Sequence, residues 1–234
     1  MIATLAACAA PPPSATPWDP LEPANRGIHA FNTGLDRFVL RPASKGYGTI
    51  LPAPVRQGVS NVAANLDLPG DVANGLLQAD PESVVQNSFR FVVNSTVGLG
   101  GLWDPASKIG LVHDQTDFGE TLHVWGLGEG PYVELPAFGP STLRDGVGTV
   151  VDIAFNPLGY ALEFPEKDYA TAAKLASRIG DRYRYGSTID SILYESADSY
   201  AQARLLYLQN RRFELGQTVD QAAADDGFID PYED

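Results

Sequence analysis

Three histidines, His29, His113 and His123, are the side chains best suited to metal binding or acid–base chemistry at neutral pH. None has a second histidine four residues away and none lies in an HExxH pattern, so the sequence indicates no metal site. The Gly-x-Ser-x-Gly pattern of a serine hydrolase is also absent. We therefore predict that the histidines are structural, and that the protein is not an enzyme and needs no cofactor.

Glycine-rich segments come next, because glycine lets a backbone approach a phosphate closely. Gly126, Gly128 and Gly130 are followed by Pro131, at the place where a dinucleotide-binding helix would have to begin. The run 98–101 lacks the lysine of a phosphate-binding loop. These glycines are expected to supply turns, and a passive binding or conducting role is favoured over nucleotide-driven chemistry.

Cys8 is the one cysteine of the chain, so neither an intramolecular disulfide nor a paired-cysteine metal site can form. The run Leu5-Ala6-Ala7-Cys8 precedes a proline-rich stretch and resembles a bacterial lipobox, in which the thiol takes a lipid chain. The alternative is an ordinary small residue in a flexible N-terminus. Residues 1–7 lack the charged start and the full apolar stretch of a signal peptide, so we expect the natural start to lie upstream.

Composition narrows the classes of partner. The chain has 234 residues, of which 44% are hydrophobic, as in a folded domain. Its formal charge of −13 would repel a nucleic acid, so nucleic acid is excluded as a partner. The segment 217–234 has six acidic residues and no basic one, which predicts a disordered tail, with partner docking as the alternative. The sequence has no run of about 18 apolar residues, so it predicts no membrane-spanning helix.

Hydrophobic periodicity predicts a mainly α, single-domain fold. Pro42 is expected to end the first helix, and the Leu68-Pro69-Gly70 run is expected to break the second. Asp80 should cap the helix that follows it, and Ser141 a later one. The expected helices cover 23–40, 54–66, 72–77, a stretch from Asp80 toward Gly98, another from Ser141 to Asn156, then 169–183, 188–195 and 199–215.

Periodicity is lost between residues 101 and 140. This stretch is rich in glycine, proline and aromatic residues, which predicts a long, ordered, functional loop. The β-branched run Tyr132–Leu135 indicates local extension within it.

Several runs in and around this stretch are unusual enough to compare with known families. The longest read GETL at 119–122, GLGEGPYVELP at 126–136 and GPSTLRD at 139–145. Others are Asp19-Pro20-Leu21-Glu22, Asn25-Arg26, Arg41-Pro42, Asn65-Leu66, Asp80-Pro81, Asn94-Ser95, the glycines 98, 100 and 101 with Asp104, and the run 198–209. Together they span about 19–215, and the chain resembles the MlaA (VacJ) family.

The resemblance implies an outer-membrane lipoprotein of a Gram-negative bacterium, built as a ring of amphipathic helices in the inner part of the bilayer and associated with trimeric porins. It implies that mislocalised phospholipids leave the outer leaflet through the ring and reach a periplasmic carrier of the Mla pathway. The ring is expected to span 19–216, after a signal remnant, lipobox and spacer at 1–18. Amphipathic helices that cannot cross a bilayer singly fit this arrangement.

The resemblance also implies functional residues. For Gly126, Gly128 and Gly130 it suggests a Gly-rich hairpin loop that gates or shapes the channel, and the alternative is a surface turn. Arg41 and Arg144 are candidates for contact with a phosphate headgroup, because a guanidinium matches phosphate oxygens. Ordinary ion pairing is the alternative for both arginines.

Phe31 and Asn32 match an early aromatic–Asn element of the family and are a possible channel element. Thr33 stands where another aromatic residue is expected, so packing of Phe31 in the core is an alternative. Two rival functions stay open: a porin-associated adaptor without conduction, and a periplasmic lipid hydrolase. A hydrolase would need a nucleophile and a base within hydrogen-bond reach.

Overall fold

The computed structural model describes residues 19–217, so the interpretations of Cys8, of the 1–18 segment and of the acidic tail after Gln217 lie outside the described residues. Within that range the protein is mainly α, with one two-stranded sheet. The elements are α1 (Glu22–Leu35), the π-helical turn η1 (Asp36–Leu40), α2 (Arg41–Ile50), α3 (Ala53–Leu77), α4 (Pro81–Thr96), α5 (Pro105–Lys108), α6 (Phe118–Val124), β1 (Tyr132–Leu135), β2 (Gly139–Thr142), α7 (Leu143–Ala154), α8 (Pro157–Ala161), α9 (Glu166–Arg184), α10 (Gly186–Asp190), the π-helical turn η2 (Ser191–Glu195) and α11 (Ser199–Glu214).

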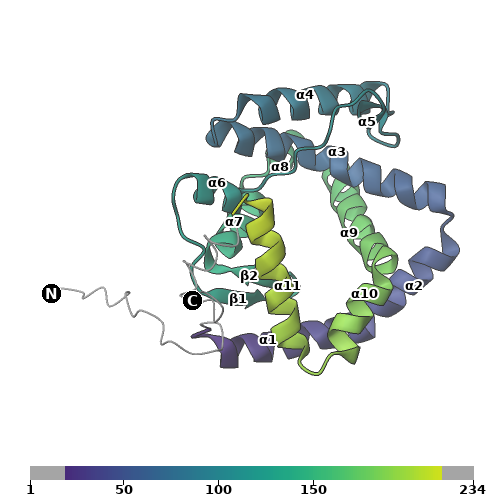
Figure 1. The fold of residues 1–234 in the computed structure, drawn as a ribbon. Helices are drawn as coiled ribbons and strands as arrows, with labels where there is room; N and C mark the ends of the chain where they lie inside the picture. Colours follow the sequence, from purple (N-terminus) through teal and green to yellow (C-terminus); the bar gives the residue numbers. More distant parts are fainter. Residues whose placement is uncertain (1–18, 218–234) are drawn as a thin grey trace.

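The helices form a ring (Figure 1). α1 and α2 follow one side of it, α3 crosses the opposite side, and α9 and α10 lead back toward α1. α4 packs against α3 on the outside, and α11 packs against β2. The predicted ring of helices in a single domain is confirmed.

The first helical segment does not end at Pro42, so that prediction is wrong. Helical backbone continues from α1 through η1 and α2. In η1 the Arg41 N–H donates to the Asp36 carbonyl, one residue further back than in an α-helix, and Pro42 then lies in the first turn of α2. A proline is tolerated there because the shifted pattern leaves no hydrogen bond for its missing N–H to lose.

The break predicted at Pro69 is absent as well, because α3 continues through it to Leu77. A proline inside a helix removes a hydrogen bond and costs about 3 kcal/mol. Here α3 packs along both α4 and α9, and Leu68, directly before the proline, is only 1% exposed. Packing against two neighbours outweighs the local loss, and sequence periodicity cannot show such neighbours.

The stretch 101–140 is more regular than the loop predicted for it. It contains α5, α6 and β1, and the extension expected at Tyr132–Leu135 is confirmed as β1. β1 pairs antiparallel with β2, so that Tyr132 lies opposite Thr142 and Leu135 opposite Gly139. Elements this short contain too few residues to establish a period in the sequence.

Side-chain caps fix where helices begin. The predicted cap at Asp80 is confirmed, because its carboxylate accepts two backbone N–H groups of the first turn of α4. The cap of α7 is Thr142 rather than Ser141, since Thr142 accepts the Asp145 N–H and Ser141 belongs to β2. The last three predicted helices are present as α9, as α10 with η2, and as α11.

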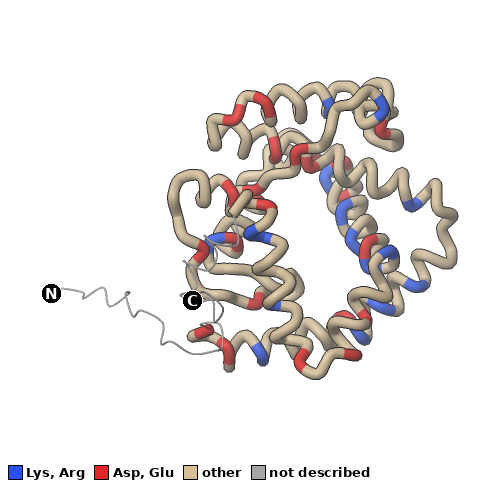
Figure 2. The backbone as a smooth tube through the Cα atoms, viewed as in Figure 1, with Lys and Arg blue, Asp and Glu red and all other residues tan. Residues whose placement is uncertain are grey.

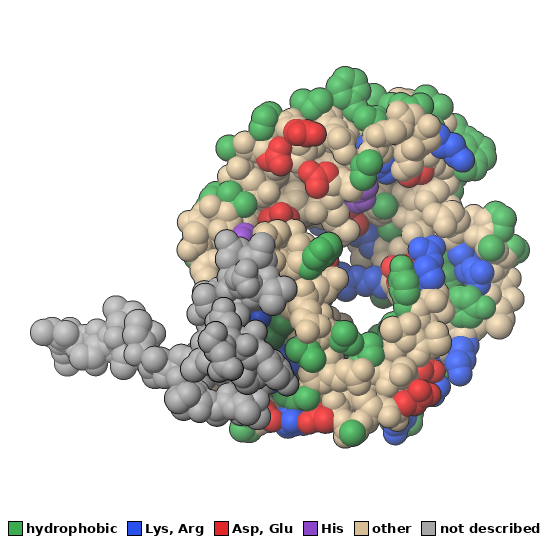
Figure 3. Space-filling view, in the orientation of Figure 1, with side chains coloured by type: hydrophobic (Ala, Val, Ile, Leu, Met, Phe, Trp, Pro, Cys, Tyr) green, Lys and Arg blue, Asp and Glu red, His purple; other side chains and the backbone are tan. Residues whose placement is uncertain are grey.

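Burial in this ring is inverted relative to a water-soluble protein. Among the described residues the buried apolar side chains are Ala63, Leu68, Ala106, Leu122, Tyr132 and Tyr200, while buried polar and charged side chains are more numerous. On α4, Val85, Phe89 and Val92 recur at helical spacing and are 54%, 59% and 57% exposed. Figure 3 shows apolar side chains around the outer edge of the molecule. No helix within 19–217 is long and apolar enough to cross a membrane.

Candidate functional site

An opening lies between the helices in the space-filling view (Figure 3). Basic side chains are visible within it, and basic positions follow α9 along its edge (Figure 2). Lys167, Lys174, Arg178 and Arg182 are spaced by four or seven residues and therefore share one face of α9. We call these four residues the basic stripe.

Arg178 differs from its neighbours in the basic stripe. Lys174 Nζ lies 2.5 Å from Asp67 Oδ1, and Arg182 binds both carboxylate oxygens of Asp36 at 2.6 and 2.8 Å. Arg178 is exposed and has no carboxylate within ion-pair distance in the described part of the chain. Its guanidinium lies instead 5.6 Å from the centre of the Phe138 ring, at the tip of the β1–β2 hairpin. The hairpin tip and an unneutralised cation therefore meet across the ring.

Two asparagines of α1 hold this hairpin. Asn25 makes hydrogen bonds of 3.0 and 2.9 Å with the backbone of β1. Asn32 donates to the Leu135 carbonyl at 3.0 Å and accepts the Ala137 N–H at 2.7 Å. Phe31 is 57% exposed, so its alternative placement in the core is wrong. The structure thus gives Asn32 a role in positioning the hairpin. The residues in contact are about a hundred positions apart in the sequence, so no local pattern could predict the contact.

Gly126, Gly128 and Gly130 lie in the loop between α6 and β1 rather than in a hairpin turn. Gly126 has a φ of +88° and closes the C-terminus of α6: its N–H donates to the His123 carbonyl at 2.8 Å, and the Leu127 N–H donates to the Leu122 carbonyl at 2.9 Å. The hairpin of this protein is formed by β1 and β2, with its turn at 136–138. The glycine pattern alone does not distinguish a helix stop from a hairpin turn, and the gating role of these three glycines stays a prediction.

Arg41 lies in a charged cluster at the corner where η1, α2, α9 and α10 meet. Its Nη2 is 2.6 Å from Asp190 Oδ2, and Arg182 reaches Asp190 Oδ1 at 2.6 Å. Burial disfavours the charged form of Asp36, but hydrogen bonds from Arg182 and Tyr194 outweigh it, and the pKa of Asp36 is lowered. Arg41 therefore already has a carboxylate partner, and its contact with a headgroup stays a prediction.

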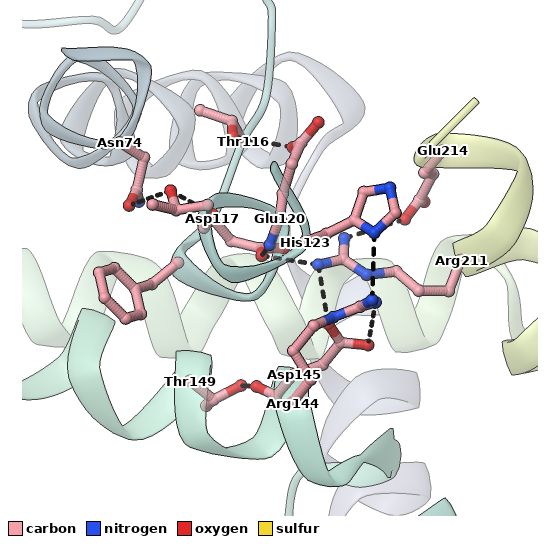
Figure 4. Close-up of polar contacts among 12 residues, drawn as sticks. Asn74, Thr116, Asp117, Glu120, His123, Arg144, Asp145, Thr149, Arg211 and Glu214 are labelled. Atoms are coloured by element: carbon pink, nitrogen blue, oxygen red, sulfur yellow. Dashed lines mark hydrogen bonds and ion pairs between the residues drawn. The ribbon is translucent and has the colours of Figure 1, made fainter. Parts of the chain in front are cut away.

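Arg144 lies in a second cluster, between α6, α7 and α11 (Figure 4). Its Nε is 3.1 Å from Asp145 Oδ1, and its Nη1 is 3.4 Å from His123 Nδ1. Arg211 reaches the same Asp145 oxygen at 3.2 Å and Asp117 Oδ1 at 2.6 Å. Since Arg144 is only 4% exposed, a phosphate would have to rearrange this cluster to reach it.

Polar contacts also join the first described residues to the last helix. Arg204 Nη1 on α11 is 2.7 Å from Asp19 Oδ2, directly before α1. Arg26 on α1 binds both oxygens of Asp198, the cap of α11, at 3.1 and 2.8 Å. The ring is therefore closed by ion pairs between its two ends.

His29 contributes to the same closure. Its Nε2 is 3.0 Å from Ser199 Oγ and its Nδ1 is 3.3 Å from Glu134 Oε1, so a serine–histidine pair is present beside a pocket of about 340 Å³. The Arg26 guanidinium of that pocket is engaged by Glu22 and Asp198. The arrangement ties α1, β1 and α11 together. Within 19–217, no group of three or more metal-binding side chains is arranged to hold a metal ion.

Comparison with known proteins agrees with this architecture. The family model described as MlaA lipoprotein matches residues 17–214. The intermembrane phospholipid transport system lipoprotein MlaA of Escherichia coli (strain K12) is 35% identical over 199 residues, which cover 83% of this chain and 77% of that protein. The corresponding Haemophilus influenzae protein is 33% identical over 201 residues, covering 84% and 79%. An uncharacterized protein of Rickettsia bellii is 37% identical over 195 residues, covering 83% and 75%.

A solved structure reported as the structural basis for maintenance of bacterial outer membrane lipid asymmetry has a TM-score of 0.71 and 35% identity, and the match covers 85% of this chain and 99% of that one. The fold and the opening define a class of proteins in which amphipathic helices surround a polar passage. This chain belongs to the MlaA lipoprotein family.

Proposed function

We propose that this protein is a passive conduit that removes mislocalised phospholipids from the outer leaflet of the outer membrane and hands them to a periplasmic carrier of the Mla pathway. Relatives named as intermembrane phospholipid transport lipoproteins and a neighbour associated with outer membrane lipid asymmetry support this function. The single observation that carries it is the inverted distribution of polarity, with apolar side chains outside the ring and charged ones in its opening.

This distribution lowers the barrier to lipid movement. Exposing one CH₂ group of an acyl chain to water costs about 0.8 kcal/mol, so a whole tail cannot pass through water at an appreciable rate. A ring whose outer face lies in hydrocarbon can leave the tails in the membrane while the headgroup crosses a wet opening. The exposed guanidinium of Arg178 offers the headgroup phosphate a partner there. No chemical step is required, in keeping with a protein that is not an enzyme.

We further propose that the ring lies in the outer membrane of a Gram-negative bacterium, embedded from the periplasmic side and anchored by acylation of Cys8. Residues 1–18 would then be signal remnant, lipobox and spacer, 19–216 the ring, and 217–234 an acidic extension. Trimeric porins are the proposed neighbours in the membrane. Intact-protein mass spectrometry of the membrane fraction tests the anchor, and an unmodified Cys8 in that fraction would refute it.

Labelling of surface phospholipid tests the conduit itself. Cells without the gene should expose more phosphatidylethanolamine to an amine reagent that does not cross membranes, and the wild-type gene should restore the low level. Equal labelling with and without the gene would reject the function.

The adaptor alternative is tested with a charge reversal in the opening. Arg178→Glu keeps the outer face but repels a phosphate, so a conduit should lose clearance while an adaptor should not. Lys108→Glu makes the same charge change at the exposed end of α5 and serves as the matched control. Clearance that is equal in the two variants would favour the adaptor.

A further inference from the structure

A separate polar pocket lies where α2, the start of α3 and the end of α9 meet. Its volume is about 270 Å³, and its lining includes Tyr47, Arg56, Asp181 and Arg184. A water molecule occupies about 30 Å³ in the liquid, so the pocket has room for a headgroup but not for a lipid with its acyl chains.

Reciprocal packing of glycine against tyrosine builds the walls of this pocket. Gly48 on α2 lies under the Tyr183 ring of α9, where an added Cβ would be 2.2 Å from Tyr183 Cδ2. Gly180 on α9 lies under the Tyr47 ring of α2, where an added Cβ would be 3.1 Å from Tyr47 Cε1. The two helices are therefore held close together, and both tyrosines are fixed at the pocket.

The charged residues of the pocket are not paired with one another. Arg56 donates to the Gly48 carbonyl at 2.6 Å and lies 4.7 Å from the centre of the Tyr183 ring. Arg184 donates to Gln57 Oε1 at 3.4 Å. Neither arginine, nor Asp181, forms an ion pair within residues 19–217, although the chain has 29 acidic residues against 16 basic ones. Two unneutralised cations and one carboxylate thus share a small space.

One wall of the pocket contains an unpartnered phenol. The Tyr47 hydroxyl is buried and has no hydrogen-bond partner in the described part of the chain. A buried hydroxyl without a partner is unfavourable, and the Tyr47 side chain would have to turn before a group in the pocket could satisfy it. Outside the pocket, Ile50 and Val55 are 78% and 48% exposed on the two sides of the link between α2 and α3. Both lie within three residues of side chains that line the pocket, so apolar surface adjoins the pocket along the chain.

We propose that this pocket binds the headgroup of a zwitterionic phospholipid, one that carries both a phosphate and a primary ammonium. Arg56 and Arg184 bind the phosphate, and Asp181 binds the ammonium. The acyl chains stay outside, against Ile50 and Val55. The inference rests on the proposed function, and it adds a place where the protein distinguishes one phospholipid from another.

Titration of the full-length protein in detergent tests this site. The probes are dihexanoyl phosphatidylethanolamine, dihexanoyl phosphatidylglycerol, which lacks the ammonium, and inorganic phosphate. The wild type should bind the ethanolamine lipid more tightly than the glycerol lipid. Asp181→Asn should weaken binding of the ethanolamine lipid by about tenfold and leave the glycerol lipid unchanged, whereas Arg184→Gln should weaken both by about tenfold.

Matched variants away from the pocket control for charge. Asp168→Asn and Lys108→Gln alter exposed residues of α9 and α5 and should change neither affinity. Arg184 is exposed and makes one long hydrogen bond, so Arg184→Gln should keep the helical content and melting temperature of the wild type. An unchanged lipid preference in Asp181→Asn, or unchanged affinities in Arg184→Gln, would overturn the proposal.

The inorganic phosphate probe distinguishes a lipid site from a simple anion site. Inorganic phosphate that binds as tightly as the ethanolamine lipid would show a simple anion site and would also overturn the proposal. Failure of this inference can be told apart from failure of the conduit. If the wild-type protein shows no preference for the ethanolamine lipid in the titration but still clears surface phospholipid in cells, only the pocket is rejected. If the wild-type protein shows neither the lipid preference in the titration nor clearance of surface phospholipid in cells, the proposed function is rejected too.

Discussion

Asp104 shows how one carboxylate stabilises several parts of the ring. It accepts the Ser107 N–H at 3.1 Å as the cap of α5, and it binds Asn94 at 2.9 Å and Arg90 at 3.1 Å on α4. Burial opposes its charge, but the hydrogen bonds from Ser107 and Asn94 and the charge of Arg90 outweigh burial and lower the pKa to about 2. In an unfolded chain the pKa of an aspartate is about 3.9. The stabilisation is therefore complete above that pH and is lost as the pH falls toward the folded value.

Asp104→Asn is expected to weaken this acid sensitivity. The melting temperature of the wild type should fall as the pH drops from about 4 to about 2, and that of the variant should fall less, because it has no charge to lose there. At neutral pH the variant should be less stable by about 1–2 kcal/mol. Circular dichroism melts in detergent from pH 7 to pH 2 measure both effects. Asp168→Asn, at an exposed position, should melt like the wild type, and a parallel decline in all three proteins would refute the role of Asp104.

Residue roles were predictable from the sequence where the partner is local. Asp80 caps the helix that directly follows it, so a few neighbouring residues suffice to predict the cap. Arg41 binds Asp190, which is 149 residues away, and Asn32 binds a hairpin more than a hundred residues away. Only the folded ring shows that these polar residues bind the protein itself. The pocket of Arg56, Asp181 and Arg184 carried no sequence signal for the same reason.

Close helix packing makes a prediction for α2. Gly48→Ala would place a Cβ 2.2 Å from Tyr183, and relieving this clash should destabilise the protein by about 1–3 kcal/mol. Gly46→Ala lies in the same helix with nothing within 4 Å of the added Cβ, so it should be neutral or stabilise by up to about 1 kcal/mol. Thermal unfolding of both variants measures the two effects separately, since Gly46→Ala changes only helix propensity and Gly48→Ala also disturbs packing. Equal effects would show that α2 and α9 are not in close contact.

The loop between α6 and β1 makes another prediction. Gly128→Pro fixes φ near −65° and should stiffen the loop, so that outer-leaflet clearance weakens while protein level and anchoring persist. Gly128→Ala, whose added Cβ meets nothing within 4 Å, is the control and should behave like the wild type. Detergent sensitivity of the cells reports clearance. Wild-type sensitivity in the proline variant would count against a gating role for Gly126, Gly128 and Gly130.

Elements were predicted well where periodicity extends over several turns, as in α4, α9 and α11. The two errors at Pro42 and Pro69 have one cause. A proline removes one hydrogen bond, but this loss does not decide whether the helix stops. At Pro42 the helix continues through a shift to π-helical bonding, and at Pro69 it continues because α3 packs against α4 and α9. Neither is visible in a local window.

For the whole molecule, the apolar outer face should bind a membrane even without the lipid anchor. Full-length Cys8→Ser protein is expected to float with vesicles of phosphatidylethanolamine and phosphatidylglycerol. Phe89→Asp in that background removes a side chain worth about 1.5–3 kcal/mol of burial and should reduce binding about tenfold or more. Thr171→Asp adds the same charge to an exposed position on α9 and is the matched control. Equal flotation of the two variants would exclude α4 from the membrane contact.

The sequence alone could not show which side of each helix faces the lipid. Periodicity shows that a helix has an apolar face, but in a ring that face points outward, where a water-soluble protein would turn it inward. The ring was predicted from the resemblance to a known family, whereas the residue pattern predicted only helices compatible with a ring. The opening and its basic stripe required the tertiary structure.

Closure of the ring through Arg26–Asp198 and Arg204–Asp19 also determines when the molecule can be completed. These contacts join residues more than 170 positions apart, so they form only after almost the whole chain has been synthesised. Before that, α1 can already bind β1 through Asn25 and Asn32, but Asp19 and Arg26 have no partner on α11. A chain that ended before Asp198 would keep the contacts of α1 with β1 but would lack both of these ion pairs.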